Sequence, residues 1–199
     1  TLQHRPVGVV ADQARRIDRH VVVQASFHFP LDRLEGFALL SDLTGDPVVF
    51  EIPGVVHRYV APLFRSGCVG EAPAPMRRLE AAVVDSLETL IGAIGPGIPA
   101  EDLHRQSVAS FARHGYAVGH RSGYSVGVNY APDWGEGNLF SILEGETRPL
   151  QAGMVFHLVP GIYVPPDFVV VISETVIVTD TGCEVVTSLG PREHREAAT

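Results

Sequence analysis

The acid with the clearest chemical potential is Glu51, which interrupts an apolar run. Residues 48–52 read Val-Val-Phe-Glu-Ile after a turn signal at 44–47, so they are predicted to form a short strand. A carboxylate among such side chains is costly unless it is paired or protonated, and burial raises its proton affinity. A cationic substrate restores the charged form, which is the form that acts as a nucleophile. The alternative is that Glu51 is a polar residue at the exposed edge of a half-buried strand.

Three further side chains have the types needed for acid–base chemistry. Glu174 lies in a strand expected at residues 169–179 and is a candidate to accept substrate N–H donors or to activate water. His157 and His57 are candidates to carry protons near neutral pH. Simpler explanations stay open, because alternation along the strand allows Glu174 to face solvent and a core histidine is usually a hydrogen-bonded structural group.

Composition sets the class of partner. The 199 residues carry 15 Lys+Arg against 23 Asp+Glu, a net charge of −8, which argues against nucleic acids and anionic membranes as partners. No apolar run approaches the roughly 20 residues that span a bilayer, and no signal-peptide core follows the N-terminus. Two cysteines fit a reducing compartment. We therefore expect a single-domain cytoplasmic protein that acts on a small molecule, with no nucleic-acid or membrane partner.

Two helices are expected in the middle of the chain. Pro73 suits a first helical turn, and apolar residues recur at three- and four-residue spacing over residues 76–94 before a Gly-Pro-Gly stop at 95–97. A second helix is expected after Pro99 and ends near His114. Three of the nine histidines lie on or just after this second helix, where surface positions are more typical than zinc ligands. They are His104, His114 and His120.

The rest of the chain favours strands. β-branched and aromatic runs bounded by Pro, Gly and Asp predict them, and they follow the helices in a block. This order favours an α+β fold with antiparallel pairing over alternating βαβ units. The remaining expected strands are residues 21–29, 122–130, 155–160, 169–179 and 184–188.

Four segments in order resemble the creatinase/methionine aminopeptidase superfamily, whose catalytic domain has the pita-bread fold. The likeness covers about residues 48–190, and the order and spacing of the segments carry it. It implies a curved antiparallel sheet with flanking helices. The segments are 49–54 (VFEIPG), 58–65 (RYVAPLFR), 153–163 (GMVFHLVPGIY), and 174–179 with 182–185 (ETVIVT, GCEV).

The metallopeptidases of that superfamily hold two metal ions with two Asp, one His and two Glu side chains, and the resemblance assigns each position here. The positions carry Glu51, Pro62, Tyr124, Val159 and Ser173, in that order. One acid and no imidazole remain, whereas hard divalent ions need several converging oxygen or nitrogen donors. We therefore expect no metal ion, no other cofactor and no metallopeptidase activity.

Other residues resemble the ectoine hydrolase branch of the superfamily. The motifs are 57–59 (HRY), 61–63 (APL), 123–127 (GYSVG), 132–136 (PDWGE) and 156–157 (FH). Ectoine hydrolases open a cyclic amidine without metal. The resemblance implies attack on the ring carbon by Glu51, with Glu174 as acid–base partner and His157 moving protons. The residues expected around the substrate are His57, Arg58, Tyr59, Arg65, Tyr124, Tyr130, Asp133, Trp134 and Glu136.

Some of these residues also have simpler explanations. Arg58 and Arg65 can pair with nearby acids instead of binding a substrate carboxylate. The segment from Asp133 to Gly135 can be a turn whose tryptophan packs into the core. The sequence alone leaves both alternatives open.

The beginning of the chain departs from the family pattern. Ectoine hydrolases carry an extra N-terminal domain that helps to build the partner's active site in a dimer, and residues 1–47 show neither that domain nor the long helices that open a pita-bread domain. We expect an atypical segment at 1–47, a pita-bread domain truncated in its first half at 48–190, and a flexible tail at 191–199. Strand edges left exposed by the shortened half predict a homodimer.

Three functions are compatible with these features. The first is a metal-independent hydrolase of a small cyclic amidine or lactam-like C–N substrate. The second is a non-hydrolytic biosynthetic enzyme, such as a cyclase, dehydratase or isomerase, that uses the same pocket. The third is a non-catalytic module that binds a small molecule or a peptide, because a fold alone does not determine activity.

Overall fold

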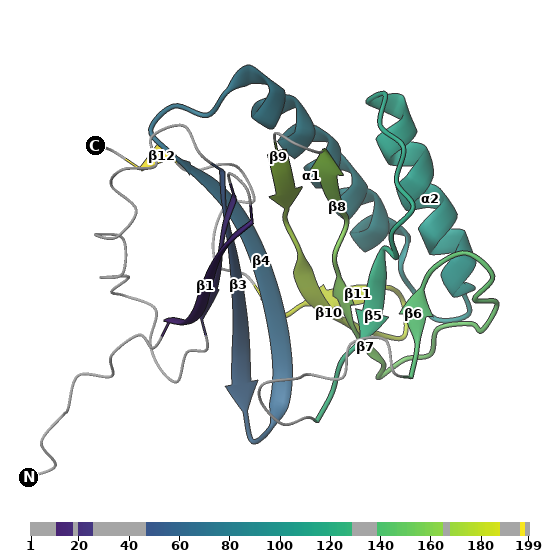
Figure 1. Ribbon diagram of the computed structural model, residues 1–199. Coiled ribbons are helices and arrows are strands. Elements are labelled where there is room, and N and C mark those ends of the chain that lie inside the picture. Colours follow the sequence, from purple (N-terminus) through teal and green to yellow (C-terminus); the bar gives the residue numbers. More distant parts are fainter. Residues whose placement is uncertain are drawn as a thin grey trace, which may run out of the picture.

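The computed structural model describes residues 11–17, 20–25, 47–128, 139–164, 168–187 and 196–197. These residues form two five-stranded sheets, a two-stranded sheet and two helices (Figure 1), which confirms the predicted α+β class. The elements in chain order are β1 (Ala11–Ile17), β2 (His20–Ala25), β3 (Pro47–Val56), β4 (Tyr59–Val69), α1 (Ala74–Ala93), α2 (Ala100–Arg113), β5 (Gly123–Ser125), β6 (Ser141–Ile142), β7 (Val155–Leu158), β8 (Gly161–Val164), β9 (Phe168–Val171), β10 (Glu174–Val178), β11 (Cys183–Val185) and β12 (Glu196–Ala197).

The first sheet has the strand order β1-β2-β3-β4-β12, and the β3–β4 hairpin is its longest ladder. β3 contains the strand predicted around Glu51 and is ten residues long. The two turn residues, His57 and Arg58, have φ angles of 49° and 71°. Positive φ at both positions matches the twist of the flanking strands, although it is unfavourable for residues other than glycine. The turn fixes a register in which Glu51 lies opposite Phe64 of β4.

The second sheet has the order β11-β10-β7-β5-β6, and all its neighbours are antiparallel. The strands predicted at 122–130, 155–160 and 184–188 correspond to the shorter strands β5, β7 and β11. Residues 129 and 130 lie outside the described part of the chain. β7 is central, because it pairs with both β5 and β10. Its side chains therefore have neighbours on both sides within the sheet.

The single strand predicted at residues 169–179 is wrong, because the chain leaves the ladder at Ile172 and Ser173. β9 before this break pairs with β8, and β10 after it pairs with β7. At the break, the Ser173 N–H donates to the Phe64 carbonyl at 3.2 Å, and the Phe64 N–H donates to the Ser173 hydroxyl at 2.7 Å. The segment is thus hydrogen-bonded to β4 of the first sheet, and these two hydrogen bonds join the two sheets.

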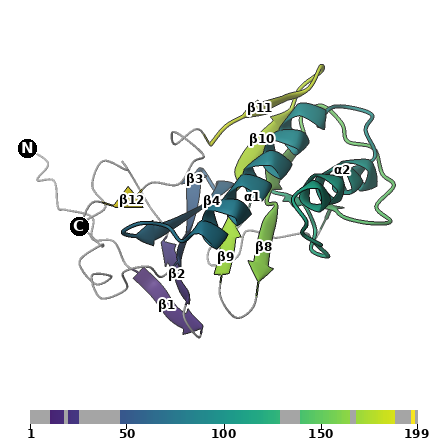
Figure 2. The same ribbon diagram turned by 90° about the horizontal axis from the view of Figure 1, so that it is seen from above.

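The two predicted helices are confirmed as α1 and α2, which lie side by side (Figures 1 and 2). α1 ends at Ala93, one residue before the predicted end, and its apolar stripe is buried. A buried hydrogen bond of 2.7 Å joins the hydroxyls of Ser86 on α1 and Ser107 on α2. Neither helix of the described residues is long and apolar enough to cross a membrane. The buried stripe of α1 comprises Met76, Leu79, Val83, Leu87 and Leu90.

One carboxylate ties the end of α2 to α1. Asp85 accepts hydrogen bonds from the Ser110 hydroxyl at 2.6 Å, from Arg113 at 2.9 Å and from His114 at 3.1 Å. The Ser110 bond, followed by those of His114 and Arg113, holds the pKa of Asp85 below its ordinary value of 3.8, although burial opposes this. The predicted surface position of His114 is consistent with this partly exposed pair.

We expect the Asp85→Asn variant to lose about 1 kcal/mol of unfolding free energy near neutral pH, a modest value because solvent screens the pair. A carboxylate with a lowered folded-state pKa stabilises the protein above its unfolded pKa, and this contribution disappears as the pH falls through the folded pKa. The difference from wild type should therefore persist at pH 5–8 and shrink below about pH 4. Urea unfolding at several pH values measures it. Glu184→Gln, which removes an exposed carboxylate from β11, is the matched control and should change little. A difference that grows in acid would contradict the assignment.

The two sheets pack against each other through a small apolar cluster. Val60 of β4, Tyr124 of β5 and Val159 after β7 are its buried members. Val55 and Phe64 of the first sheet pack against them. Cross-strand partners in an antiparallel ladder share a face, so the register places Glu51 on the face of β3 and β4 that carries Phe64 and Val60. This face of the hairpin is the one turned toward the second sheet.

Candidate functional site

The centre of the contact between the sheets is a buried imidazole, that of His157 on β7. The residue is 0% exposed. Its Nδ1 lies 2.8 Å from the Tyr124 hydroxyl of β5, and its Nε2 lies 2.6 Å from the Ser173 hydroxyl just before β10. The Phe64 ring of β4 stacks on the imidazole with centroids 5.6 Å apart, and the Tyr124 ring meets it edge-on at 5.1 Å. These four residues, called the His157 cluster below, join both sheets at one point.

The imidazole of the His157 cluster is neutral. Burial, with a smaller effect from the nearby positive charge of Arg121, lowers the pKa of His157 from 6.5 to about 3. As the pH falls from about 6.5 toward 3, the unfolded chain binds a proton that the folded protein does not, so this residue lowers acid stability. At neutral pH, His157 therefore differs in charge from the proton carrier that the sequence predicted. It is a neutral side chain with both ring nitrogens hydrogen-bonded.

Glu174 and Arg65 form a buried ion pair beside this cluster. Arg65 Nη2 donates to Glu174 Oε1 at 2.6 Å, and the Thr187 hydroxyl donates to Oε2 at 2.5 Å. Arg65 Nη1 donates to the carbonyls of Ser173 at 2.7 Å and Phe64 at 2.9 Å. The exposed fractions are 18% for the Arg65 side chain and 2% for that of Glu174. Arg65 therefore pairs with an acid, which is the simpler of the two explanations that the sequence allowed. Both carboxylate oxygens of Glu174 accept hydrogen bonds within the protein.

Glu51 is half-buried on β3 and lies opposite Phe64. The Phe64 ring is stacked on His157, so the predicted nucleophile and the His157 cluster share one face of the hairpin. The structure therefore brings Tyr124 and His157 together, and it places Glu51 on the hairpin face that carries Phe64. Of these residues, Glu51 is the one that carries a carboxylate.

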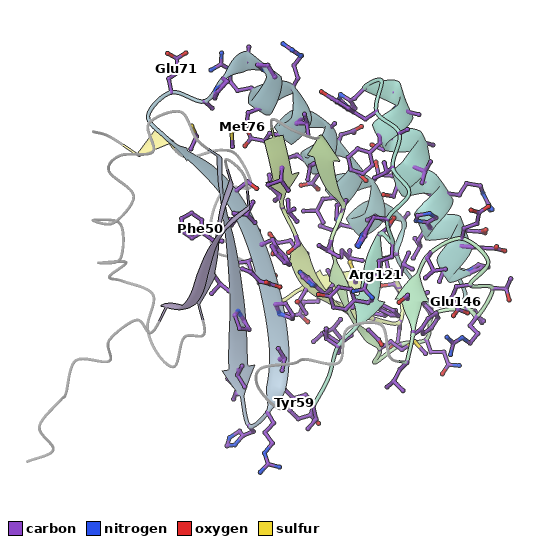
Figure 3. All side chains as sticks on the ribbon, viewed as in Figure 1. Phe50, Tyr59, Glu71, Met76, Arg121 and Glu146 are labelled. Carbon is purple, nitrogen blue, oxygen red and sulfur yellow. The ribbon has the colours of Figure 1, made fainter. Side chains whose placement is uncertain are left out.

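The other predicted substrate-binding residues lie apart from this face or outside the described residues. His57, Arg58 and Tyr59 lie at the turn of the β3–β4 hairpin, and the Tyr59 side chain is 64% exposed (Figure 3). The turn begins about five residues beyond Glu51, a distance of roughly 17 Å along a strand. The remaining four residues lie outside the described part of the chain, and they are Tyr130, Asp133, Trp134 and Glu136.

Comparison with known proteins decides the family. The model of metallopeptidase family M24 matches residues 40–180, well over half of the chain. The chain belongs to family M24. It is 34% identical over 150 residues to the ectoine hydrolase of Halomonas elongata, in an alignment that covers 75% of this chain and 37% of that enzyme. The chain therefore spans less than half the length of this curated relative.

Solved structures of M24 proteins confirm the pita-bread fold. The dipeptidase PepE from Mycobacterium ulcerans matches with a TM-score of 0.66 and 28% identity, over 76% of this chain and 40% of that one. The X-Pro aminopeptidase from Thermotoga maritima matches with a TM-score of 0.68 and 25% identity, over 77% of this chain and 42% of that one. The described residues correspond to only part of these longer M24 chains.

The side chains at the expected M24 metal positions do not fit two metal ions. The Tyr124 and Ser173 hydroxyls are both bonded to His157, and the Ser173 oxygen also accepts the Phe64 N–H. Pro62 and Val159 have no side-chain donor atoms. Within the described ranges, no three His, Cys, Asp or Glu side chains gather as a metal site requires. The cluster fills this region of the fold with neutral hydrogen-bonded groups.

Arg121 is a site residue that the sequence did not reveal. Its guanidinium lies 4.3 Å from the centroid of the Tyr124 ring, and its charge contributes to the lowered pKa of His157 (Figure 3). It also lines a cleft of about 520 Å³ with His104 and Glu144. Arg121 precedes the GYSVG motif by two residues. An arginine before a strand is too common to predict this stacking from sequence alone.

Proposed function

We propose that this protein is a metal-independent hydrolase that opens a small cyclic amidine or lactam-like C–N substrate, with Glu51 as the nucleophile. The observation that carries the proposal is the His157 cluster, in which Tyr124 and Ser173 hold His157 instead of a metal ion. The 34% identity to an ectoine hydrolase supports the substrate class. The shared face of Glu51 and Phe64 supports the choice of nucleophile.

The proposed reaction begins when a carboxylate oxygen of Glu51 bonds to the electrophilic ring carbon. The ring C–N bond then breaks, and the released nitrogen takes up the proton that the second nitrogen of the amidinium gives up as it forms a C=N bond. Water hydrolyses the bond between the carbon and Glu51, which regenerates the carboxylate, so the product contains one added water. A cationic amidinium substrate favours the ionised form of a half-buried carboxylate, which is the reactive form.

In this scheme Glu174 is a positioning residue. Its two oxygens are held by Arg65 and Thr187, and Arg65 in turn holds the Ser173 carbonyl. The ion pair thus keeps Ser173 where its hydroxyl meets His157. We propose this supporting role in place of the acid–base role expected from sequence.

A second candidate function is a non-catalytic module that binds a small molecule. The observation that favours it is the full hydrogen bonding and 0% exposure of His157 and Ser173, because a catalytic centre usually contains exposed groups. Tight binding of an amidine that remains chemically unchanged for hours would support this function over the hydrolase.

We also propose a homodimer, since edge strands such as β11 present backbone groups with which a second copy of the chain can pair. Light scattering of the purified chain measures the mass. A monomer at all concentrations tested would contradict this proposal without affecting the proposed chemistry.

Metal removal tests the proposed function. We expect hydrolysis of ectoine by the protein to change less than about twofold after dialysis against EDTA, and again after addition of Mn²⁺, Co²⁺ or Zn²⁺, since the reaction uses no metal. Product formation is followed by chromatography, and metal content is measured on the same samples. An X-Pro dipeptide is the control substrate and should not be cleaved. Activity that requires metal, or cleavage of the dipeptide, would overturn the proposal.

A further inference from the structure

We propose that a cleft beside α2 is a second small-molecule site, and that it binds an organic cation with an apolar body, such as a protonated amine or amidine. The cleft has a volume of about 520 Å³, which is within the usual range for sites that hold a small molecule. It lies between α2 and the two segments 118–121 and 143–144. The inference does not depend on the proposed reaction at Glu51, because none of the lining residues belongs to β3 or β4.

Part of the wall of the cleft is apolar. Val108 of α2, Val118 and Leu143 contribute side chains from three separate segments of the chain. Leu143 is 39% exposed although it is a large apolar residue. The apolar body of a ligand would remove this surface from water, which favours binding. The described residues hold no group of three side chains suited to a metal ion, so the wall suits an organic cation better than a bare metal ion.

Two carboxylates on opposite sides of the cleft can bind the charged group of the ligand. Glu101 lies in the first turn of α2, and Glu144 follows β6. Within the described residues, neither carboxylate takes part in a hydrogen bond or an ion pair. Ionised carboxylates accept charge-assisted hydrogen bonds from the N–H groups of an ammonium or an amidinium. The net charge of −8 of the whole chain adds to the attraction of cations.

The two arginines that line the cleft already have partners. Arg105 forms an ion pair with Asp102, which lies one turn earlier on α2. The Arg121 guanidinium lies 4.3 Å from the centroid of the Tyr124 ring, in a cation–π contact. These contacts hold both positive charges within the protein, whereas the two carboxylates remain available. The charge of the cleft therefore favours a cation over an anion.

His104 is a neutral side chain at the edge of the cleft. Its Nδ1 lies 2.9 Å from the hydroxyl of the buried Ser122, so the ring is held in place. Burial lowers the pKa of His104 below its ordinary value of 6.5, a shift that Glu144 opposes and His120 increases. The imidazole is therefore largely uncharged at pH 7.5, and it does not repel a cation bound beside Glu144.

Titration with benzamidinium chloride tests the cleft, because this probe joins a planar apolar ring to an amidinium. Followed by ¹H–¹⁵N NMR at pH 7.5, it should bind with a dissociation constant of about 1 mM or tighter and shift the signals of Val118, Gly119 and Leu143. Benzamide is the neutral counterpart and benzoate is an anion of the same shape, and both should bind at least about tenfold more weakly. Equal binding of benzamide, or no shift at the cleft with about 10 mM probe, would overturn the proposal.

Variants of the lining residues locate the bound probe. Glu101→Gln and Glu144→Gln should each weaken binding by about three- to tenfold, since each removes a charge and keeps the size of the side chain. Gly119→Leu keeps both carboxylates and narrows the cleft. A Cβ at Gly119 would meet no heavy atom within 4 Å, so this variant should fold and should bind at least about tenfold more weakly. Glu184→Gln on β11 is the matched control and should bind like wild type. Binding that all three cleft variants leave unchanged would contradict the assignment.

Glu51→Gln separates the cleft from the candidate functional site, whose proposed substrate is also a cation. This variant should bind benzamidinium within about twofold of wild type, because Glu51 does not line the cleft. A loss of binding in Glu51→Gln, with binding preserved in the cleft variants, would assign the probe to the candidate functional site and overturn the second site. Failure of the proposed hydrolase would show instead as absence of turnover of a cyclic amidine, which this titration does not measure.

Discussion

Replacing Glu51 with glutamine should lower the turnover of a cyclic amidine by about three orders of magnitude or more, because an amide oxygen is a poor nucleophile. Substrate binding should change much less, since the side chain keeps its size and its place opposite Phe64. Stopped-flow or chromatographic assays of kcat measure the loss. A wild-type sample quenched during turnover should also contain a mass adduct on the peptide that includes Glu51, and the variant should not.

Two control variants sharpen this experiment. Glu184→Gln removes one exposed carboxylate from β11 and should leave both kcat and thermal stability near wild type. Glu51→Asp keeps the charge but withdraws it by one methylene, so it should retain some activity. A Glu51→Gln variant that is folded and keeps more than about a tenth of wild-type turnover would rule out covalent catalysis by this residue.

The helices show what local patterns can predict. The stripe from Met76 to Leu90 recurs at helical spacing, and the structure buries it. Pro73 lies at the N-cap of α1 and Pro99 at that of α2, as their positions in the sequence indicate. The residues that determine a helix lie within one or two turns of one another in the sequence. Tertiary contacts therefore stabilise the helical conformation that these local patterns already favour.

The strands show where local patterns fail. Residues 169–179 are apolar enough for one strand, but Ser173 bonds to Phe64, which is 109 residues away in the sequence, and the ladder breaks there. β4 contains Pro62, which argues against a strand in a local reading, yet the structure places it opposite Pro53 inside the hairpin. In the first case a partner distant in sequence decides the backbone conformation, and in the second the opposite strand of the hairpin does.

Several residues of the candidate site were predictable from the sequence, but their contacts were not. Family resemblance singled out Glu51, Tyr124, His157 and Glu174. It could not show that Glu174 pairs with Arg65, because the two residues belong to different sheets and their types suit many other roles. Nor could it show that His157 is held on both nitrogens, since this requires β5, β7 and the Ser173 break to converge. The contacts therefore lead us to propose other roles for some of these residues, and they add Arg121, which the sequence did not single out.

The buried ion pair leads to the largest expected effect on stability. Replacing Arg65 with methionine should cost about 3–5 kcal/mol of unfolding free energy, because it leaves the Glu174 carboxylate, 2% exposed, without its cation. The variant also loses the two donors to the Ser173 and Phe64 carbonyls that help to join the sheets. Urea unfolding monitored by fluorescence measures the change, and Arg65→Lys provides a milder variant should Arg65→Met fail to fold.

The Arg65→Met/Glu174→Met double variant separates the charge from the packing. If the cost arises from an uncompensated buried carboxylate, the double variant should recover most of the stability that Arg65→Met loses, because no charge remains to be desolvated. Arg105→Met removes one side of the exposed pair with Asp102 and should cost less than about 1 kcal/mol. A double variant as unstable as Arg65→Met would show that the hydrogen bonds to the Ser173 and Phe64 carbonyls, and not the pairing of charges, hold this junction together. In that event Arg65 would act chiefly as a backbone clamp on the segment that carries Ser173, and Glu174 would serve to orient it.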